Sequence, residues 1–206
     1  MTTSPPRRLP RGRSALPAGE VSKVQRARLL AAMADAMSEL GFVGTPVGEI
    51  LKRAGVSRQS FYELFTSKLD CFMAAFDDVA QLMEEWLDAA VTEPGDPLER
   101  FERGIAAYVE LLAMEPGYAR LFIVESHAAG PEAIARRLDL QELLTERLAG
   151  VLEASDDEAR FACRMIVAAV GGMVTGPLIS GDTTALREVG DQIIAHVRVL
   201  RRQGVL

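Results

Sequence analysis

The sequence has few residues that hold metals or form disulfides. Cys71 and Cys163 are its two cysteines among 206 residues, and no C-x-x-C pair occurs, so neither a disulfide framework nor a cysteine zinc site is indicated. A reducing cytoplasm is the simplest setting for such a chain. His127 and His196 stand far apart, without cysteine or paired carboxylates at ligand spacing. We therefore expect no metal site and a cytoplasmic protein.

Catalytic signatures and long apolar runs are also missing. The chain has no G-x-S-x-G, no G-x-G-x-x-G and no phosphate-binding loop. The longest uncharged run, residues 165–181, is shorter than the roughly 20 residues that a membrane helix needs. Residues 1–20 lack the apolar core of a signal peptide. We therefore expect no enzyme, no cofactor and no membrane protein.

Charge divides the chain into two parts. The net charge is −6, but residues 1–70 carry 11 Lys or Arg and 6 Asp or Glu, whereas residues 71–206 carry 12 and 23. A basic first third indicates that only this part meets a polyanion, although chance and an arginine-rich tail would give the same division. The acidic remainder weakly favours a neutral or cationic small molecule, or simply serves solubility.

The rest of the pattern indicates helix throughout. β-branched alternation with a period of two is absent, so we expect an all-α fold. Residues 1–20, rich in Pro, Gly, Ser and Arg, are expected to form a disordered basic arm. Residues 21–70 are expected to form a three-helix domain, and residues 71–206 a second helical domain. Helices are expected near 22–40, 46–54, 57–65, 66–90, 97–114, 116–127, 131–153, 156–178 and 184–202.

Two short helices joined by a tight turn give the outline of a helix-turn-helix. Thr45 and Pro46 supply a hydroxyl cap and a first-turn proline for one helix, and Gly55 lies in the turn. Ser57 caps the other helix, and two phenylalanines at helical spacing, Phe61 and Phe65, anchor it to a core.

The polar residues of the second motif helix fit contacts with DNA. Arg58, Gln59 and Ser60 follow the Ser57 cap, in the turn that meets base edges in the major groove, where Arg pairs with guanine and Gln with adenine. Tyr62 adds a hydroxyl group at the edge of this face. Each residue alone also fits a solvated surface helix, but together they favour DNA.

Residues 22–70 resemble the DNA-binding domain of the TetR family of transcriptional regulators. The resemblance is carried by Thr45, Ile50, Ala54-Gly55-Val56-Ser57, Phe61-Tyr62, Phe65 and Ser67-Lys68. It implies about nine helices, a homodimer, a recognition helix at 57–65 and a C-terminal domain that binds a small molecule. It also implies that Thr45, Tyr62 and Lys68 contact phosphates. Gln59-Ser60 replaces the Gly-Thr that is common in the family, so a base preference does not carry over.

The basic arm carries four arginines, Arg7, Arg8, Arg11 and Arg13. Such arms enter the minor groove beside a major-groove helix or act as non-specific electrostatic tails. In both cases each neutralised phosphate adds about −0.9 to the log–log salt slope of binding. Arg11 and Arg13 are therefore candidate DNA contacts.

Large side chains with polar or polarisable groups gather in the middle of the second domain. They line a ligand pocket between helices or belong to an ordinary core. The candidate pocket residues are Trp86, Tyr108, Met114, Tyr118, Phe122, Glu125, Phe161 and Met165.

The last two expected helices carry features of a dimer interface. Ala168, Gly172 and Gly176 form a small-residue ridge that lets another helix approach closely, and an apolar seam follows on the final helix. Two such helices from each subunit would make a four-helix interface with two-fold symmetry, unless the seam packs within one subunit. The seam consists of Leu186, Val189, Ile193, Val197 and Leu200.

The sequence therefore predicts a ligand-responsive transcriptional regulator. Its expected partners are double-stranded DNA, a second copy of the chain and a small-molecule effector, and its expected action is repression at a pseudo-palindromic operator. A dimeric DNA-binding regulator without an effector is the alternative, and a helical enzyme is a further one.

Overall fold

The computed structural model describes residues 18–206, which contain helices and no strand. Joining α6, η1 and α7 into one rod, and α9 with α10 through Val174, leaves nine helical segments, as expected for the all-α fold. The elements are α1 (Ala18–Gly44), α2 (Val47–Ala54), α3 (Arg58–Leu64), α4 (Lys68–Thr92), α5 (Pro97–Met114), α6 (Pro116–Arg120), the π-helix η1 (Leu121–Glu125), α7 (Ser126–Ala129), α8 (Pro131–Leu152), α9 (Asp157–Met173), α10 (Thr175–Ser180) and α11 (Thr183–Arg202).

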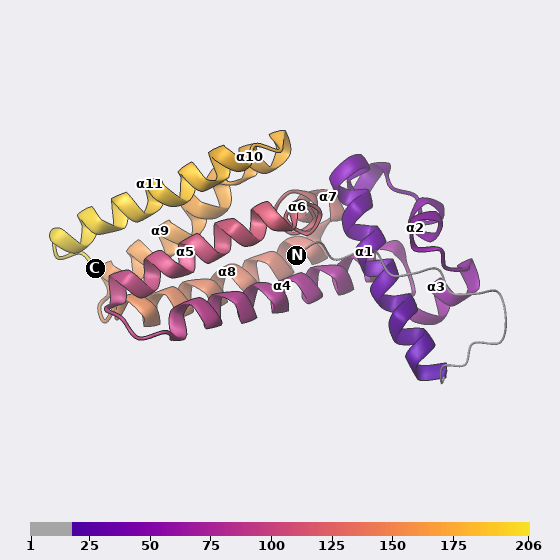
Figure 1. Ribbon diagram of the computed structural model, residues 1–206, viewed down its shortest axis with the longest axis horizontal. Helices are drawn as coiled ribbons and strands as arrows, with labels where there is room; N and C mark the ends of the chain where they lie inside the picture. The colour runs from indigo at the N-terminus through magenta and orange to yellow at the C-terminus, as the bar shows by residue number, and fades with distance from the viewer. Residues whose placement is uncertain (1–17) are drawn as a thin grey trace.

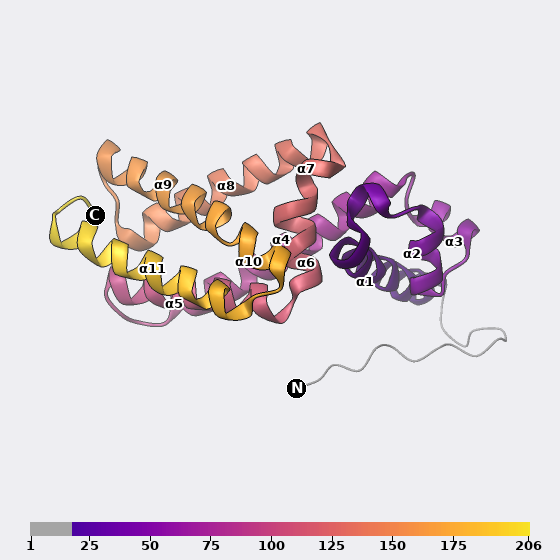
Figure 2. The same ribbon diagram turned by 90° about the horizontal axis from the view of Figure 1, so that it is seen from above.

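The helices form two groups along the long axis of the molecule (Figures 1 and 2). We call residues 18–67, with α1–α3, the head, and residues 68–206, with α4–α11, the body. The α4 helix begins beside α1 and runs along the body next to α5. The expected boundary at residue 70 therefore falls in the first turn of α4.

The two motif helices begin in different ways. The Ser57 side chain accepts a hydrogen bond from the Ser60 backbone N–H at 3.0 Å, which confirms the predicted cap of α3. Thr45 does not cap α2: Pro46 precedes that helix without a side-chain cap, and Thr45 Oγ1 donates to the Gly41 carbonyl at 2.7 Å. Between the two helices, Gly55 adopts φ +65°, a left-handed conformation that favours glycine.

The head has a small aromatic core. Ile50 and Phe61 are completely buried, and Phe65 nearly so. The Phe61 and Phe65 ring centroids lie 5.7 Å apart, so α3 is held from its inner side. Phe42 packs edge-on against Phe72 of α4, with centroids 5.1 Å apart, and extends this core toward the body.

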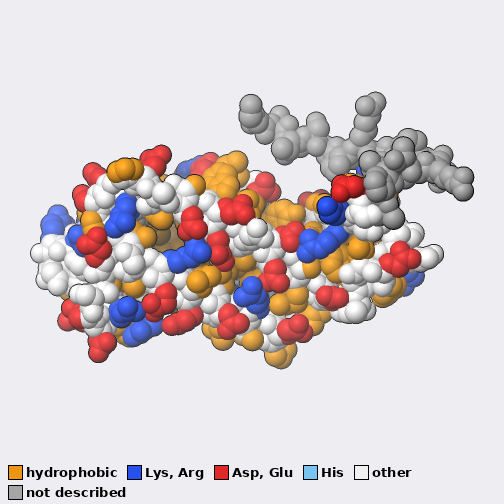
Figure 3. All heavy atoms as spheres, turned by 90° about the horizontal axis from the view of Figure 1, so that it is seen from below, with side chains coloured by type: hydrophobic (Ala, Val, Ile, Leu, Met, Phe, Trp, Pro, Cys, Tyr) orange, Lys and Arg blue, Asp and Glu red, His pale blue; other side chains and the backbone are white. Residues whose placement is uncertain are grey.

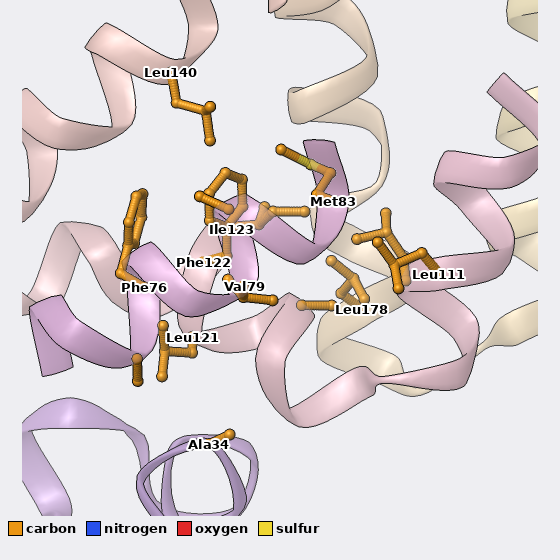
Figure 4. Close-up of a cluster of buried hydrophobic side chains, with 14 of the residues drawn as sticks. Ala34, Phe76, Val79, Met83, Leu111, Leu121, Phe122, Ile123, Leu140 and Leu178 are labelled. Carbon is orange, nitrogen blue, oxygen red and sulfur yellow. The ribbon is translucent and has the colours of Figure 1, made fainter. Parts of the chain in front are cut away.

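One buried cluster continues from the head through the body (Figure 4). Ala34 of α1 lies at its lower edge in that view, and Leu140 of α8 at its upper edge. Phe76 of α4 stacks on Phe122 of η1, with centroids 4.6 Å apart. The π-helical turn is thus packed directly against the helix that joins the two groups.

The apolar seam of α11 packs within one subunit, which corrects its assignment to the dimer interface. Leu186 and Val197 are almost fully buried by the described residues alone. A Cβ on Gly190 would lie 3.2 Å from Val109 Cγ2, so α11 and α5 approach closely there. Arg187 and Arg198 add ion pairs to Glu110 and Glu102 of α5. The other seam residues, Val189 and Ile193, are also buried, and Leu200 is half-buried.

Unlike the buried seam of α11, the small-residue ridge on α9 and α10 is exposed to solvent. Ala168, Gly172 and Gly176 are all exposed, and Phe161 and Met165 on the same helix are 52% and 50% exposed. Among the described residues, Asp157–Ser180 is also the one helical stretch whose length and composition would suffice to cross a membrane. Since a single stretch of this kind also occurs in soluble proteins, we interpret it as an uncovered apolar face.

Candidate nucleic-acid interface and ligand cavity

The first turn of α3 presents polar side chains to solvent. Arg58 and Gln59 are both exposed, while Phe61 on the opposite side of the helix is fully buried. Arg58 makes no hydrogen bond or ion pair with any residue in 18–206. Gln59 Nε2 donates to Glu63 Oε1 at 2.9 Å, one turn along the same helix. The guanidinium is therefore free to meet an acceptor, and the amide would exchange one exposed partner for another.

Ser60 and Tyr62 flank this turn. The Ser60 and Ser57 hydroxyl oxygens are 3.0 Å apart, so Ser60 is tied to the cap. Tyr62 is 50% exposed, and its ring packs edge-on against Phe61 with centroids 5.2 Å apart. The structure therefore brings Ser57, Arg58, Gln59, Ser60 and Tyr62 onto one accessible end of α3.

Thr45 and Lys68, which the family resemblance assigns to phosphate contacts, are both hydrogen-bonded within the protein, and their contact with phosphates stays a prediction. Thr45 is completely buried. Lys68 Nζ donates to the Phe42 and Thr45 carbonyls at 2.6 and 3.0 Å and lies 4.0 Å from the centre of the Phe42 ring. Burial lowers the pKa of Lys68. The Lys68 side chain thus fastens the end of α1 to the start of α4, whereas the Thr45 hydroxyl bonds within the end of α1.

Most of the positive charge at the N-terminal end of the chain lies in the arm, outside the head. Residues 18–67 carry six Lys or Arg and five Asp or Glu, which leaves the head with a net charge of +1. Arg53 is neutralised by Glu39 and Glu49, at 2.6 and 3.0 Å. The arginines of the arm, including Arg11 and Arg13, lie outside the described residues.

The body contains a cavity of about 140 Å³. Residues of α4, α5, η1, α8 and α9 line it, and most of them are apolar. Figure 3 shows the face of the molecule opposite to that of Figure 2, with a recess in the body where hydrophobic side chains lie between charged groups. An apolar cavity with few polar groups is the usual form of a small-molecule site.

Two of the eight predicted pocket residues, Tyr108 and Phe122, line this cavity. Phe122 also borders a second cavity of about 20 Å³, which Tyr118 lines. The other four large side chains are only partly covered by the described residues. These are Trp86, Met114, Phe161 and Met165, which are 37%, 56%, 52% and 50% exposed.

Sequence reasoning missed the polar residues of the cavity. Arg137, Gln141 and Arg147 on α8 line it, together with Asp88 on α4. The available signal was the repeat of Leu140, Leu144 and Leu148 at four-residue spacing, which marks an inward face of α8. Arg137 and Gln141 lie next to that face, so their inward position depends on how α8 packs.

Glu125 is buried but lies at the junction of head and body, outside the cavity. Its Oε2 accepts a hydrogen bond from the Phe42 backbone N–H at 2.8 Å. Gly41 adopts φ +68° there, and a Cβ on it would lie 3.1 Å from the same carboxylate oxygen. Arg120 is the nearest cation, 3.9 Å from Glu125 Oε1. Segment 41–45 is thus held by Glu125 from one side and by Lys68 from another.

Metal ligands do not cluster in the part of the chain that is described. Residues 18–206 hold no group of three or more His, Cys, Asp or Glu side chains placed to bind a metal ion. Cys71 and Cys163 are both buried, and burial raises the pKa of Cys71 to about 12. The candidate functional sites within residues 18–206 are therefore the α3 surface and the body cavity.

Comparison with known proteins finds the same architecture in bacterial regulators. The profile described as "Bacterial regulatory proteins, tetR family" matches residues 29–75, which include α2 and α3. The transcriptional regulator EthR of Mycolicibacterium smegmatis is 31% identical over 144 residues, 69% of this chain and 61% of its own. RutR of Escherichia coli strain K12 is 32% identical over 140 residues, 67% of this chain and 59% of its own. The match thus spans about three fifths of each relative.

A solved structure shows the same fold over most of the chain. The crystal structure of a transcriptional regulator from Rhodococcus sp. Rha1 superposes with a TM-score of 0.71 at 24% identity and covers 85% of this chain and 96% of its own. The profile, the two relatives and the fold agree with the helix-turn-helix geometry. The chain belongs to the TetR family of bacterial regulatory proteins, and both relatives are named transcriptional regulators.

Proposed function

We propose that the protein is a homodimeric, ligand-responsive repressor that binds a pseudo-palindromic DNA operator. The observation that carries the proposal is the first turn of α3, where Arg58 and Gln59 stand exposed above the buried Phe61 and Phe65. A helix held in this way can enter the major groove with its leading turn, and both side chains have forks that match base edges.

Backbone and hydroxyl groups around this turn supply further contacts. The N-terminus of α3 directs amide groups outward beside the Ser57 cap, which favours a phosphate. The Tyr62 hydroxyl is available at the edge of the helix. Arg11 and Arg13 of the arm add electrostatic affinity for the backbone or the minor groove.

Dimerisation through the exposed face of α9 and α10 would place two heads side by side. Ala168, Gly172 and Gly176 let a partner helix approach, and Phe161 and Met165 beside them offer apolar area that the single chain leaves in water. A two-fold arrangement of this face gives two α3 helices, which fit half-sites about 34–36 Å apart or a multiple of that distance.

The ligand response is supported by the walls of the cavity. Leu87 and Val91 of α4 line it, and so do Phe122 and Ile123 of η1. Glu125 in the same π-helical turn holds the Phe42 backbone in the head. A ligand that favours one arrangement of α4 and η1 would therefore shift the position of the head and the spacing of the two α3 helices.

Selection of bound fragments from random duplex DNA, at a stated salt concentration, tests the proposal. We expect an inverted repeat with two half-sites, bound by two chains per site. The proposal would be contradicted if the selected fragments shared no common sequence, or if the protein bound a half-site as a monomer with the same affinity.

A further inference from the structure

One arginine in the wall of the body cavity, Arg147, already has its charge compensated within the protein. Arg147 Nη2 lies 2.9 Å from Glu84 Oε2, and its Nη1 lies 2.5 Å from Asp88 Oδ1. Two carboxylates therefore compensate this guanidinium. Since Arg147 already has anionic partners on α4, it does not require a charged ligand.

Arg137, at the other end of the cavity, has no such partner. Its Nη1 lies 3.2 and 3.0 Å from the two ring nitrogens of His127. A guanidinium only donates, so the histidine must accept with a neutral nitrogen and brings no negative charge. Within residues 18–206 no carboxylate forms an ion pair with Arg137. Burial lowers the pKa of Arg137, but an arginine stays cationic at neutral pH.

Gln141 directs a second donor toward the same place. Arg137 Nη2 and Gln141 Nε2, one turn apart on α8, each lie 3.7 Å from the point where a Cβ would stand on Gly171 of α9. Neither nitrogen has a hydrogen-bond partner among the described residues. Because glycine leaves this point empty, the two donors face one small space.

Tyr108 adds a third donor on the α5 wall. Burial raises the pKa of Tyr108 to about 12, and the positive charge of Arg137 opposes this rise. The phenol therefore keeps its proton at neutral pH and can donate a hydrogen bond. A half-buried cation without a counter-charge is unfavourable, and a carboxylate next to these donors would remove the cost.

The volume of the cavity limits the rest of the ligand. At about 140 Å³ it is close to an engineered apolar cavity of about 150 Å³ that accepts benzene. Leu144, Leu148 and Val151 continue the apolar wall along α8, away from Arg137. The space therefore fits an apolar body of about one ring or a short chain.

We propose that this cavity binds a small amphipathic carboxylate, with its anionic end at Arg137 and Gln141 and its apolar end among the leucines of α8. The inference rests on the proposed function in one respect, namely that this carboxylate is the effector. The net negative charge of the body favours a neutral or cationic ligand. Arg137 lies at the cavity itself and has no carboxylate partner, so its charge has the larger effect on a ligand bound there.

Isothermal titration of the full-length protein tests the inference with three carboxylates, namely benzoate, phenylacetate and hexanoate, each beside its neutral primary amide. We expect at least one acid to bind at least about tenfold more tightly than its amide, a difference of about 1.4 kcal/mol. Arg137→Met should remove this preference, since it keeps the apolar stem and deletes the charge.

Gly171→Ala gives an independent test that does not alter a charged residue. The new methyl group would make ordinary contacts at 3.7 Å and occupy the point that both donors face, so carboxylate binding should fall at least about tenfold. Gly150→Ala on α8 is the matched control, because its methyl group would meet nothing within 4 Å. It should bind the acid as the unmodified protein does.

Three results would overturn the inference. The first is equal affinity for acid and amide. The second is a preference for the acid that remains in Arg137→Met. The third is that all three acids bind with a Kd above about 1 mM. Measuring operator affinity with and without the ligand distinguishes failure of this inference from failure of the proposed function. Acid binding without any change in operator affinity would refute the ligand response alone, whereas operator release by a neutral compound would refute the carboxylate alone.

Discussion

The head and the body each contain an Arg–Gln pair, and the two pairs are placed in opposite ways. On α3, Arg58 and Gln59 stand in solvent above buried phenyl rings. In the body, Arg137 and Gln141 line an apolar cavity. Neither arginine has a carboxylate partner among residues 18–206. An exposed pair can reach a macromolecule, whereas a pair in a cavity can only meet a group small enough to enter.

The surroundings also determine how unfavourable each Arg–Gln pair is in free energy when no ligand is bound. Water solvates Arg58 and Gln59 in the free protein, so their contacts with DNA exchange one set of hydrogen bonds for another. Arg137 has lost much of its water without gaining a counter-charge, and burial lowers its pKa. The body pair therefore needs a ligand more than the head pair does.

The largest effect should come from removing the anchor of the head. Phe61→Ala deletes a fully buried ring, so we expect a loss of about 3–5 kcal/mol in the free energy of unfolding of the head. Tyr62→Ala, at the adjacent half-exposed position, is the control and should lose clearly less. Chemical denaturation measures both. Equal losses would show that α3 is not held by its inner face.

Deleting the head pair should come next. In the double variant Arg58→Ala, Gln59→Ala, each lost base contact removes about 1–3 kcal/mol of discrimination, so operator affinity should fall at least tenfold. Binding to unrelated DNA should change little. The chain offers a matched control in the exposed pair Arg202 and Gln203, whose double alanine variant should bind like the unmodified protein. Fluorescence anisotropy at one salt concentration compares the three, and an equal loss in the control would contradict the role of α3.

A smaller effect is expected at the junction of the two regions. Glu125→Ala leaves the part-buried Phe42 N–H without its acceptor, a loss of about 1–3 kcal/mol. Hydrogen exchange of the Phe42 amide should become faster, and unfolding of head and body should separate. Glu142→Ala on the exposed side of α8 controls for the lost charge. Unchanged exchange at Phe42 would mean that Glu125 does not connect the regions.

The smallest effect concerns two glycines of the head with equally open surroundings. A Cβ would meet nothing within 4 Å at Gly48 or at Gly55, but only Gly55 has a positive φ. Gly48→Ala should therefore stabilise α2 by up to about 1 kcal/mol, whereas Gly55→Ala should destabilise by about 1–2 kcal/mol. Thermal unfolding would show shifts of a few degrees in opposite directions. Shifts of the same sign would contradict the local backbone argument.

The sequence predicts the head better than the body because the information in the head is local. The Ser57 cap, the Gly55 turn and the Phe61–Phe65 spacing lie within eleven residues, and the structure contains all three. Thr45 was the exception. Its hydroxyl has the chemistry of a cap, but the left-handed Gly41 brings a carbonyl within 2.7 Å of it, and this bond takes precedence.

In the body, periodicity identified the helices but not their neighbours. The seam of α11 could have packed on a second chain, and its burial and its close approach to α5 at Gly190 show that it packs internally. Large side chains such as Trp86 and Phe161 were expected in a pocket, yet they lie on uncovered faces. Arg137 lies 34 residues before Gly171, so no short motif could have placed them together.

The central claim is that the leading turn of α3 lies in the major groove, and site-directed cleavage of DNA tests it most directly. A chelated iron attached through Glu63→Cys, an exposed position on α3, would spare the buried Cys71 and Cys163. We predict cuts confined to a few bases in each half-site of the operator, with the same label at Gln203→Cys cutting weakly or not at all. Cuts spread evenly along the duplex, or equal cutting from both positions, would contradict the claim.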